Sequence, residues 1–255
     1  MSSLLTRRTL VTTGLTTAAG VTGLGAAIHF AGRYALIPPD YGTLAGVGET
    51  LTYSAQRLLT SGYSLAREFK RSDISKIPIV NGPAPVDDSF RALAAEGFKD
   101  WRLQIEGLVA NPMSFSLEEL RRLPAESHIV LHACEQGWSY IAEWTGVRLS
   151  AVLDLVKTRA QARYIVFMPF PNPRQTTGEV RVQWDSIDMA DALHPQTLLA
   201  YGMNGEVLPA DFGAPVRLRM GRQLGYKNTK YLSRIIVTDD MDLYRKGPGT
   251  WYGGI

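Results

Sequence analysis

Six short stretches of the chain carry apolar patterns that predict β-strands. From Trp101 to Glu106, apolar and polar side chains alternate one by one, which is typical of a strand with one buried face. The stretches 128–133 and 163–168 are more continuously apolar, as in buried strands. The remaining predicted strands cover residues 180–184, 216–220 and 233–238.

Helical periodicity appears in two places between these strands. One predicted helix has an apolar face made of Leu149, Val152, Leu153 and Val156. Ser116 and Glu119 have the spacing of a capping box, in which each side chain bonds the backbone N–H of the other. This predicts a short helix over Leu117–Leu123 that stops before Pro124.

The pair Asn204-Gly205 predicts a tight hairpin, because both residues tolerate the left-handed backbone that such a turn requires. Many short strands, few helices and no internal repeat indicate an α+β domain. We place this domain at residues 76–255 and expect a helical connector over 34–75, where Leu44, Leu51 and Leu58 recur every seven residues.

The N-terminal segment differs from the rest of the chain. Arg7-Arg8 precedes a long stretch without Asp, Glu, Lys or Arg that is rich in Gly, Ala and Thr. Paired arginines before such a stretch are typical of twin-arginine export signals in bacteria. The stretch is also long enough to span a bilayer. We therefore interpret residues 1–33 as a twin-arginine signal or an N-terminal anchor, which predicts a periplasmic protein or one held on the outer face of the inner membrane.

Composition narrows the classes of function. Hydrophobic residues make up 45% and charged residues 20% of the 255 residues, as in a folded globular protein. The formal net charge is only +3 and no basic run has interleaved aromatic residues, which argues against a nucleic-acid partner.

Cys134 is the single cysteine of the chain, so no internal disulfide forms. On the residues alone, three interpretations stay open. A lone cysteine is most often a small buried apolar side chain. A Cys-His hydrolase would use His128, His132 or His194 as the base. The third interpretation is a thiolate ligand of a metal other than zinc, since no second cysteine and no suitable histidine spacing support a zinc site.

The residues after Cys134 resemble a known motif. Cys134, Trp138-Ser139, Trp144-Thr145-Gly146-Val147, Leu149 and Leu153 are similar to the molybdenum-cysteine motif of the sulfite oxidase superfamily. The likeness is greatest to the bacterial periplasmic branch that includes the catalytic subunit of the protein-methionine-sulfoxide reductase.

Further blocks follow in the order typical of that family, and the likeness covers about residues 76–240. The blocks are Ala192–Ala200, Asn204–Pro209, Gly213–Leu218 and Gly225–Lys230.

This resemblance implies the fold, the cofactor and several site residues. It implies the sulfite-oxidase-like molybdopterin-binding fold and a molybdenum held by molybdopterin without an appended nucleotide. It also implies Cys134 as the protein ligand of the metal and as the catalytic residue. The residues implied to bind the cofactor are Asn81, Cys134, Arg217, Asn228, Thr229 and Lys230.

The chain departs from the periplasmic reductase pattern at several positions. Phe212 stands where an asparagine is expected and Pro169 where a threonine is expected, and the aromatic residues expected soon after Asn81 are missing. These departures leave the substrate open. A sulfite-like dianion would need cations at the metal, for which Arg163, Arg174 and Arg181 are the candidates.

The resemblance therefore predicts a molybdopterin-dependent oxidoreductase that transfers oxygen to, or reduces, a small polar substrate of the sulfoxide or sulfite type. A membrane haem protein or a cytochrome is the expected electron partner by analogy. The alternative is a binding or redox-partner protein that kept the fold without the cofactor.

Overall fold

The computed structural model describes residue 55 and residues 64–82, 84–171 and 184–240. Residues 1–33, the leucines of the expected connector and most of the predicted strand 180–184 lie outside these ranges. The elements below all belong to one compact unit, Tyr63–Ile255.

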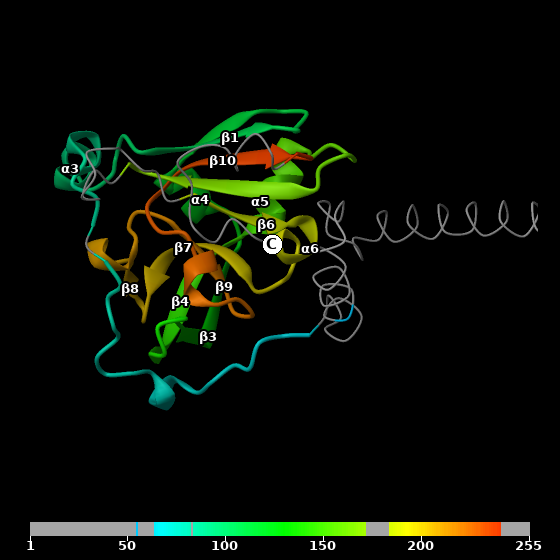
Figure 1. Ribbon diagram of the computed structural model, residues 1–255. Helices are drawn as coiled ribbons and strands as arrows, with labels where there is room; N and C mark the ends of the chain where they lie inside the picture. Colours follow the sequence, from blue (N-terminus) through cyan, green and yellow to red (C-terminus); the bar gives the residue numbers. More distant parts are fainter. Residues whose placement is uncertain (1–54, 56–63, 83, 172–183, 241–255) are drawn as a thin grey trace, which may run out of the picture. The chain divides into compact units, whose positions relative to one another are not determined.

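Two sheets, each with five strands in the described part of the chain, form the framework (Figure 1). The first sheet has the order β2-β1-β10-β5-β6; its strands are β2 (Met113–Ser116), β1 (Arg102–Gly107), β10 (Leu232–Thr238), β5 (Tyr164–Pro169) and β6 (Asp185–Asp188). Only β1 and β10 pair in parallel. The second sheet has the order β3-β4-β7-β8, with β9 also paired to β7; its strands are β3 (Ala125–Ala133), β4 (Ser139–Arg148), β7 (Thr197–Met203), β8 (Glu206–Val207) and β9 (Arg217–Met220).

Helices are few and short, which confirms the α+β prediction. The α-helices are α3 (Asp88–Ala95), α4 (Leu117–Arg122), α5 (Leu149–Val156) and α6 (Met189–Ala192). The 3-10 helices are η1 (Arg71–Asp73), η2 (Ala210–Phe212) and η3 (Gly225–Lys227). In the described ranges no helix combines the length and the apolar character that crossing a membrane requires.

Local sequence signals account for several of these elements. The capping box of α4 is present, with Ser116 and Glu119 bonding each other's backbone N–H. Asn204 and Gly205 have φ of 54° and 83°, so the turn between β7 and β8 is of the left-handed type that Asn-Gly favours.

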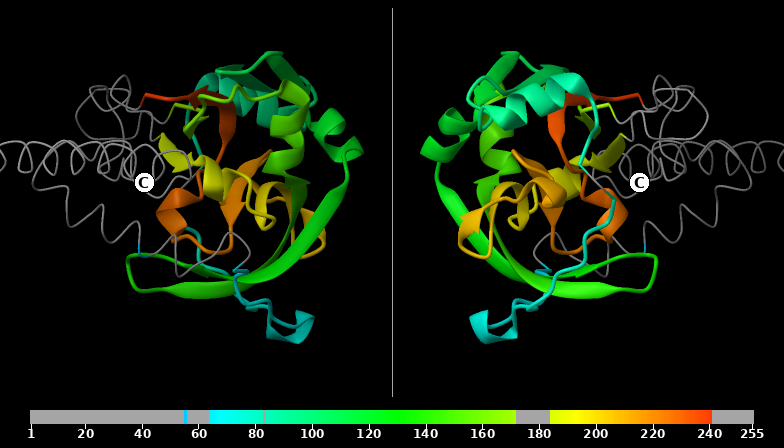
Figure 2. Two further views of the ribbon diagram at one scale, coloured as in Figure 1. Left: turned by 90° about the vertical axis from the view of Figure 1, so that its right-hand side faces the viewer. Right: turned by 90° about the vertical axis from the view of Figure 1, so that its left-hand side faces the viewer.

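The main core lies where both sheets and α5 meet. Its contributors from the first sheet include Leu103, Ile105, Ile165, Phe167 and Ile235; those from the second sheet and α5 include Leu199, Leu218, Leu149 and Val152. The β3–β4 hairpin is long and curved (Figure 2). Its inner face carries a second cluster built around Tyr140 and Trp144.

Residues 64–75 lie within the segment expected to be a helical connector, and η1 is their only helical turn. Glu68 forms an antiparallel bridge to Val130 of β3, and the Phe69 N–H donates to the Ile129 carbonyl at 2.9 Å. Gln196 fastens this segment further, because its side chain bonds both the N–H and the carbonyl of Ala66.

Candidate active site

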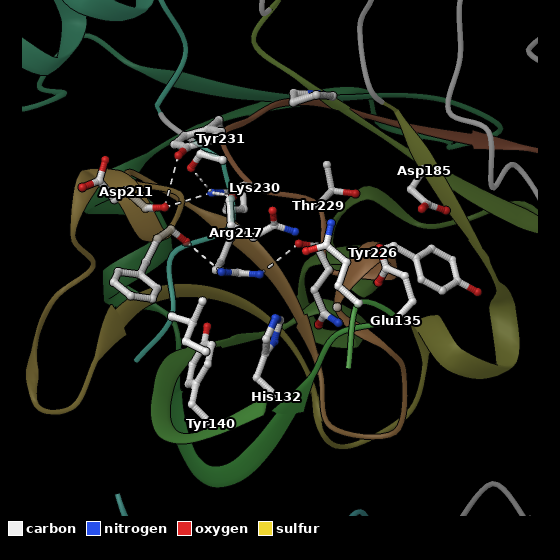
Figure 3. A pocket seen from close by; sticks show the side chains of 18 of the residues that line it. His132, Glu135, Tyr140, Asp185, Asp211, Arg217, Tyr226, Thr229, Lys230 and Tyr231 are labelled. Atoms are coloured by element: carbon white, nitrogen blue, oxygen red, sulfur yellow. Dashed lines mark hydrogen bonds between the residues drawn. The ribbon is translucent and has the colours of Figure 1, made fainter. Parts of the chain in front are cut away.

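A cavity of about 500 Å³ opens between the end of β3, the start of β9 and the loop that follows β9 (Figure 3). Segments far apart in the sequence supply its wall. The polar lining residues include Asn81, His132, Glu135, Asp185, Arg217, Asn228, Thr229 and Lys230. Five of the six residues implied to bind a cofactor therefore line one cavity.

Cys134 directly follows β3 and is 6% exposed. It is not itself a lining residue, although His132, Glu135 and Gln136 are. A tight loop fixes its backbone: the Cys134 N–H donates to the Trp138 carbonyl at 2.9 Å, and the Gly137 N–H donates to the Cys134 carbonyl at 3.0 Å. The Sγ donates to a carboxylate oxygen of Glu135 at 3.3 Å. Burial, with a smaller contribution from Glu135, raises the pKa of the thiol above its ordinary value.

Two guanidinium groups lie side by side on β9 with almost no exposure. Arg217 is 3% and Arg219 is 1% exposed. Arg217 donates to the carbonyls of Phe212 at 2.8 Å and Asn228 at 3.0 Å. Both guanidinium carbons also lie over the ring of Trp144, at 4.8 and 5.5 Å. Neither arginine has a salt bridge to any carboxylate in the described part of the chain.

Burial determines the electrostatics of this wall. It lowers the pKa of Arg217, and it lowers that of Arg219 to about 9, with the neighbouring Arg217 adding to the effect. Arg217 in the cavity wall and Arg219 next to it thus carry buried positive charge, and their hydrogen-bond partners among the described residues are carbonyl and amide oxygens. Such an arrangement suits an anionic group, because charge-assisted bonds to an anion are stronger than those to carbonyls.

Lys230 adds a third cation to the same wall. Its Nζ donates to the carbonyls of Asn81 at 2.7 Å, Asp211 at 2.9 Å and Gly82 at 3.3 Å. Burial, followed by the charge of Arg217, lowers the pKa of Lys230 to about 7. Asn81 lines the cavity at a turn where Gly82 has φ of 71°, and its backbone carbonyl is one of the three that accept from Lys230.

Asn228 and Thr229 behave differently although they are neighbours. The Asn228 carboxamide is already engaged: its Oδ1 accepts from Arg219 at 3.0 Å and from the Met220 N–H at 2.6 Å, and its Nδ2 donates to the Leu224 carbonyl at 2.8 Å. Asn228 therefore ties the loop to β9. The Thr229 hydroxyl is buried and has no hydrogen-bond partner among the described residues.

The three candidate bases of a Cys-His hydrolase do not pair with Cys134. His128 bonds Glu68 at 2.7 Å, and His194 bonds the Ser64 carbonyl and the Gln196 N–H. His132 lines the cavity, but burial and the charges of Arg217, Arg219 and Lys230 lower its pKa to about 2. A histidine that holds a proton so weakly is a poor general base near neutral pH.

A buried ion pair joins Asp185, which lines the cavity, to Lys227, which does not. Lys227 Nζ lies 2.8 Å from Asp185 Oδ1 and 2.9 Å from the Ser186 carbonyl. Lys227 and Asp185 are each 3% exposed. Burial raises the pKa of Asp185 to about 6, because its effect is larger than that of the nearby Lys227, whose positive charge lowers this pKa.

The departures from the reductase pattern lie on the cavity itself. Pro169 and Phe212 both line it. The Phe212 ring meets Tyr140 edge-on at 6.1 Å, so this part of the wall is apolar. Of the candidate sulfite-binding cations, Arg163 is exposed and is not a lining residue, while Arg174 and Arg181 lie outside the described residues.

Comparison with known proteins identifies this arrangement. Residues 91–244 match the family model of the oxidoreductase molybdopterin binding domain, which is well over half of the chain. The chain belongs to the molybdopterin-binding oxidoreductase family. Within this family, the predicted sulfite-oxidase-like fold and the resemblance to the methionine-sulfoxide reductase branch are confirmed.

Curated relatives of the molybdopterin-binding domain come from several bacteria. A putative protein-methionine-sulfoxide reductase subunit YedZ1 of Azospira oryzae is 38% identical over 170 residues, 66% of this chain and 60% of that protein. The protein-methionine-sulfoxide reductase catalytic subunit MsrP of Ralstonia nicotianae is 33% identical over 157 residues, and that of Burkholderia mallei is 32% identical. Each of these two matches covers 59% of this chain and 46% of the relative. The matched part thus spans about half the length of these relatives.

Among solved structures, the sulfane dehydrogenase SoxCD of Paracoccus pantotrophus is similar at 24% identity with a TM-score of 0.49. The match covers 56% of this chain and 39% of that one.

The cavity fits the molybdopterin that gives the family its name. Molybdopterin carries an anionic phosphate, and Arg217, Arg219 and Lys230 offer positive charge that no carboxylate among the described residues pairs in a salt bridge. His132 Nδ1 and Thr229 Oγ1 are buried polar atoms without a hydrogen-bond partner in the described chain. Both residues line the cavity, so a ligand with polar atoms would satisfy them.

Two contributors to this site, Arg219 and Asp185, were not found from the sequence. The alternation on 216–220 indicated a strand with one exposed polar face, whereas all four residues of β9 are buried. The available signal was a second arginine on the same face as Arg217. Asp185 carried no such signal, because its partner Lys227 is 42 residues away.

Proposed function

We propose that this chain is a molybdopterin-dependent oxidoreductase and that Cys134 supplies the protein ligand of its molybdenum. The observation that carries the proposal is the buried positive wall beside the loop of the single cysteine. Burying uncompensated guanidinium groups is costly for a protein. A wall of this kind is understandable if an anionic ligand is bound there in the working protein.

The residues of the wall have distinct roles in this proposal. Arg217 and Lys230 bind the cofactor's phosphate, and Thr229 and Asn81 add polar contacts. Asn228 keeps the loop in place through its bonds to β9. Cys134 binds the metal as thiolate, which requires loss of the proton that its Sγ shares with Glu135.

When bound, the cofactor supplies a metal that changes oxidation state and moves an oxygen atom or an electron pair. We infer that the substrate is a small polar molecule of the sulfoxide type, because several relatives are named as methionine-sulfoxide reductases. Reduction of a sulfoxide takes up two electrons and two protons and releases the sulfide and water. A membrane haem protein or cytochrome would supply the electrons. We propose the cofactor form without an appended nucleotide.

The substitution Cys134→Ser tests the central assignment. A hydroxyl is a harder and poorer ligand for molybdenum than a thiolate. We expect the purified variant to lose sulfoxide reduction with an artificial reductant and most of its molybdenum, while its thermal unfolding stays that of a folded domain. Ser139→Ala, an exposed position on the same motif, serves as the matched control. Wild-type activity and metal content in Cys134→Ser would remove the assignment.

Export by the twin-arginine route to the periplasm, with a cleaved or retained N-terminal segment, is part of the proposal. It rests on Arg7-Arg8 and the uncharged stretch after them. Changing both arginines to lysine should leave the folded protein in the cytoplasm, as measured by cell fractionation. Unchanged delivery would favour another route.

A further inference from the structure

His132 is a buried polar side chain whose position is not explained by any hydrogen bond within the described residues. It is 5% exposed and lines the cavity. Its Nδ1 is fully buried and has no hydrogen-bond partner in the described part of the chain. A buried nitrogen without a partner destabilises the protein, and such groups are rare in native structures.

Packing against neighbouring rings fixes the orientation of the His132 ring. The ring stacks on Tyr140 at 4.9 Å between centroids and on Trp138 at 5.9 Å, at interplanar angles of 30° and 29°. On another side, a Cβ added at Gly225 would lie only 3.0 Å from His132 Nε2. The imidazole is therefore held in one place before any ligand arrives, and glycine at position 225 leaves room for it.

The two ring nitrogens of His132 determine which ligand atoms it can bond, and its Nδ1 has no hydrogen-bond partner among the described residues. A neutral imidazole offers one donor and one acceptor nitrogen. It can therefore bond a ligand that carries both kinds of polar atom without adding charge.

We propose that His132 is a further cofactor-binding residue, a pre-positioned imidazole that hydrogen-bonds the organic part of the molybdenum cofactor. This inference rests on the proposed function. His132 precedes Cys134 by two residues and lies beside Arg217 (Figure 3). It is thus close to both the residue assigned to the metal and a residue assigned to the phosphate. The pterin has ring nitrogens, N–H groups and a carbonyl, which are suitable partners for an imidazole.

The substitution His132→Phe separates this role from packing. Phenylalanine keeps a flat ring that stacks on Tyr140 and removes both nitrogens. In cofactor-free protein the variant should be as stable as wild type or more stable, because it removes an unsatisfied buried group. In loaded protein the cofactor should dissociate about two- to tenfold faster, the range of one neutral hydrogen bond. His132→Asn, which restores an amide near Nδ1, should recover part of this loss.

His194→Phe is the matched control, since His194 is equally buried but bonds Ser64 and Gln196 and does not line the cavity. It should lower stability and leave the rate of cofactor loss unchanged. The measurements are molybdenum and released pterin per chain over time, and thermal unfolding of both forms. A His132→Phe protein that is destabilised without cofactor, or that retains cofactor like wild type, would overturn the inference. Wild-type protein that binds neither molybdenum nor pterin would instead overturn the proposed function.

Discussion

Two buried cationic regions beside the cavity, one around Lys227 and one around Arg217, differ in how their charge is compensated. Lys227 has a carboxylate partner, Asp185, at 2.8 Å, and both are nearly inaccessible to solvent. Arg217, ten residues earlier, is as deeply buried, but its hydrogen-bond partners in the described part of the chain are all carbonyl oxygens. The positive charge of Lys227 is therefore compensated by a carboxylate of the protein itself. In the proposed function, the positive charge of the Arg217 region is compensated when the anionic cofactor binds.

This difference suggests that the charges of the first region stabilise the structure of the site, whereas those of the second region are available to bind a ligand. The pair of Lys227 and Asp185 joins the loop after β9 to the start of β6, so it shapes the wall. Backbone carbonyls accept hydrogen bonds from Arg217 and Lys230. These bonds orient the two side chains but do not compensate their positive charges. Changes in the first region should therefore alter stability, and changes in the second should alter ligand binding.

The largest effect is expected from Lys227→Met in the cofactor-free protein. This change leaves the Asp185 carboxylate buried without its partner, and breaking a buried ion pair in this way costs about 3–5 kcal/mol. Urea unfolding at pH 7 measures the loss. Adding Asp185→Leu should recover much of the stability, since an apolar pair avoids the unpaired charge. A double variant as unstable as Lys227→Met would show that the ion pair is not the cause.

A smaller effect, on binding, is expected at the second region. Arg217→Ala and Lys230→Ala should each weaken cofactor binding by about 1.5–3 kcal/mol, the range of a charge-assisted hydrogen bond. This corresponds to a roughly tenfold to hundredfold loss of affinity. The double variant should lose more than either single one. Molybdenum and released pterin per mole of purified protein give the occupancy.

The chemistry of Arg217 can be tested separately. Arg217→Lys should also lose affinity if the contact is a two-pronged fork, because an ammonium group cannot reproduce it. Full occupancy in all of these variants would mean that the Arg217 region does not bind the phosphate. It would also remove the distinction between the two regions.

A further effect is the pH dependence that Lys230 gives to the stability of the cofactor-free protein. Its pKa is about 7 in the folded state, below the ordinary value of 10.5. Between these values the unfolded chain holds a proton that the folded chain has released, so stability rises with pH. The penalty is complete below pH 7 and disappears towards pH 10.5. Lys230→Met should flatten this rise in unfolding experiments between pH 7 and 10. Identical slopes in both proteins would show that burial does not perturb Lys230.

Local patterns predicted the elements whose signals lie within a few residues. The capping box at Ser116, the apolar face of α5 and the Asn204-Gly205 turn were confirmed. Strand β4 was not predicted. It is buried along much of both faces, so its sequence lacks clear alternation. Residues 64–69 were also unpredictable, because their extended form depends on pairing with β3.

The site was predictable to the extent that its residues occur in motifs. Asn81, Arg217, Asn228, Thr229 and Lys230 do meet at one cavity. Their individual tasks were not predictable, since they depend on contacts made by folding. The carboxamide of Asn228 is engaged within the protein, and the Asn81 carbonyl holds Lys230. Ligation of metal by Cys134 stays a prediction.

The extended segment at Glu68 and Phe69 has a consequence for how copies of this protein behave towards one another. β3 is the outermost strand of its sheet in the described part of the chain, and unpaired outer strands invite pairing between molecules. Backbone of the extended segment covers part of this outer edge. The Phe69 N–H bonds a carbonyl of β3, and Glu68 forms a β-bridge to Val130. The Gln196 side chain fixes this segment through hydrogen bonds to Ala66 and Glu68. We therefore expect this segment to lower the tendency of β3 to pair with the sheet of another copy of the chain.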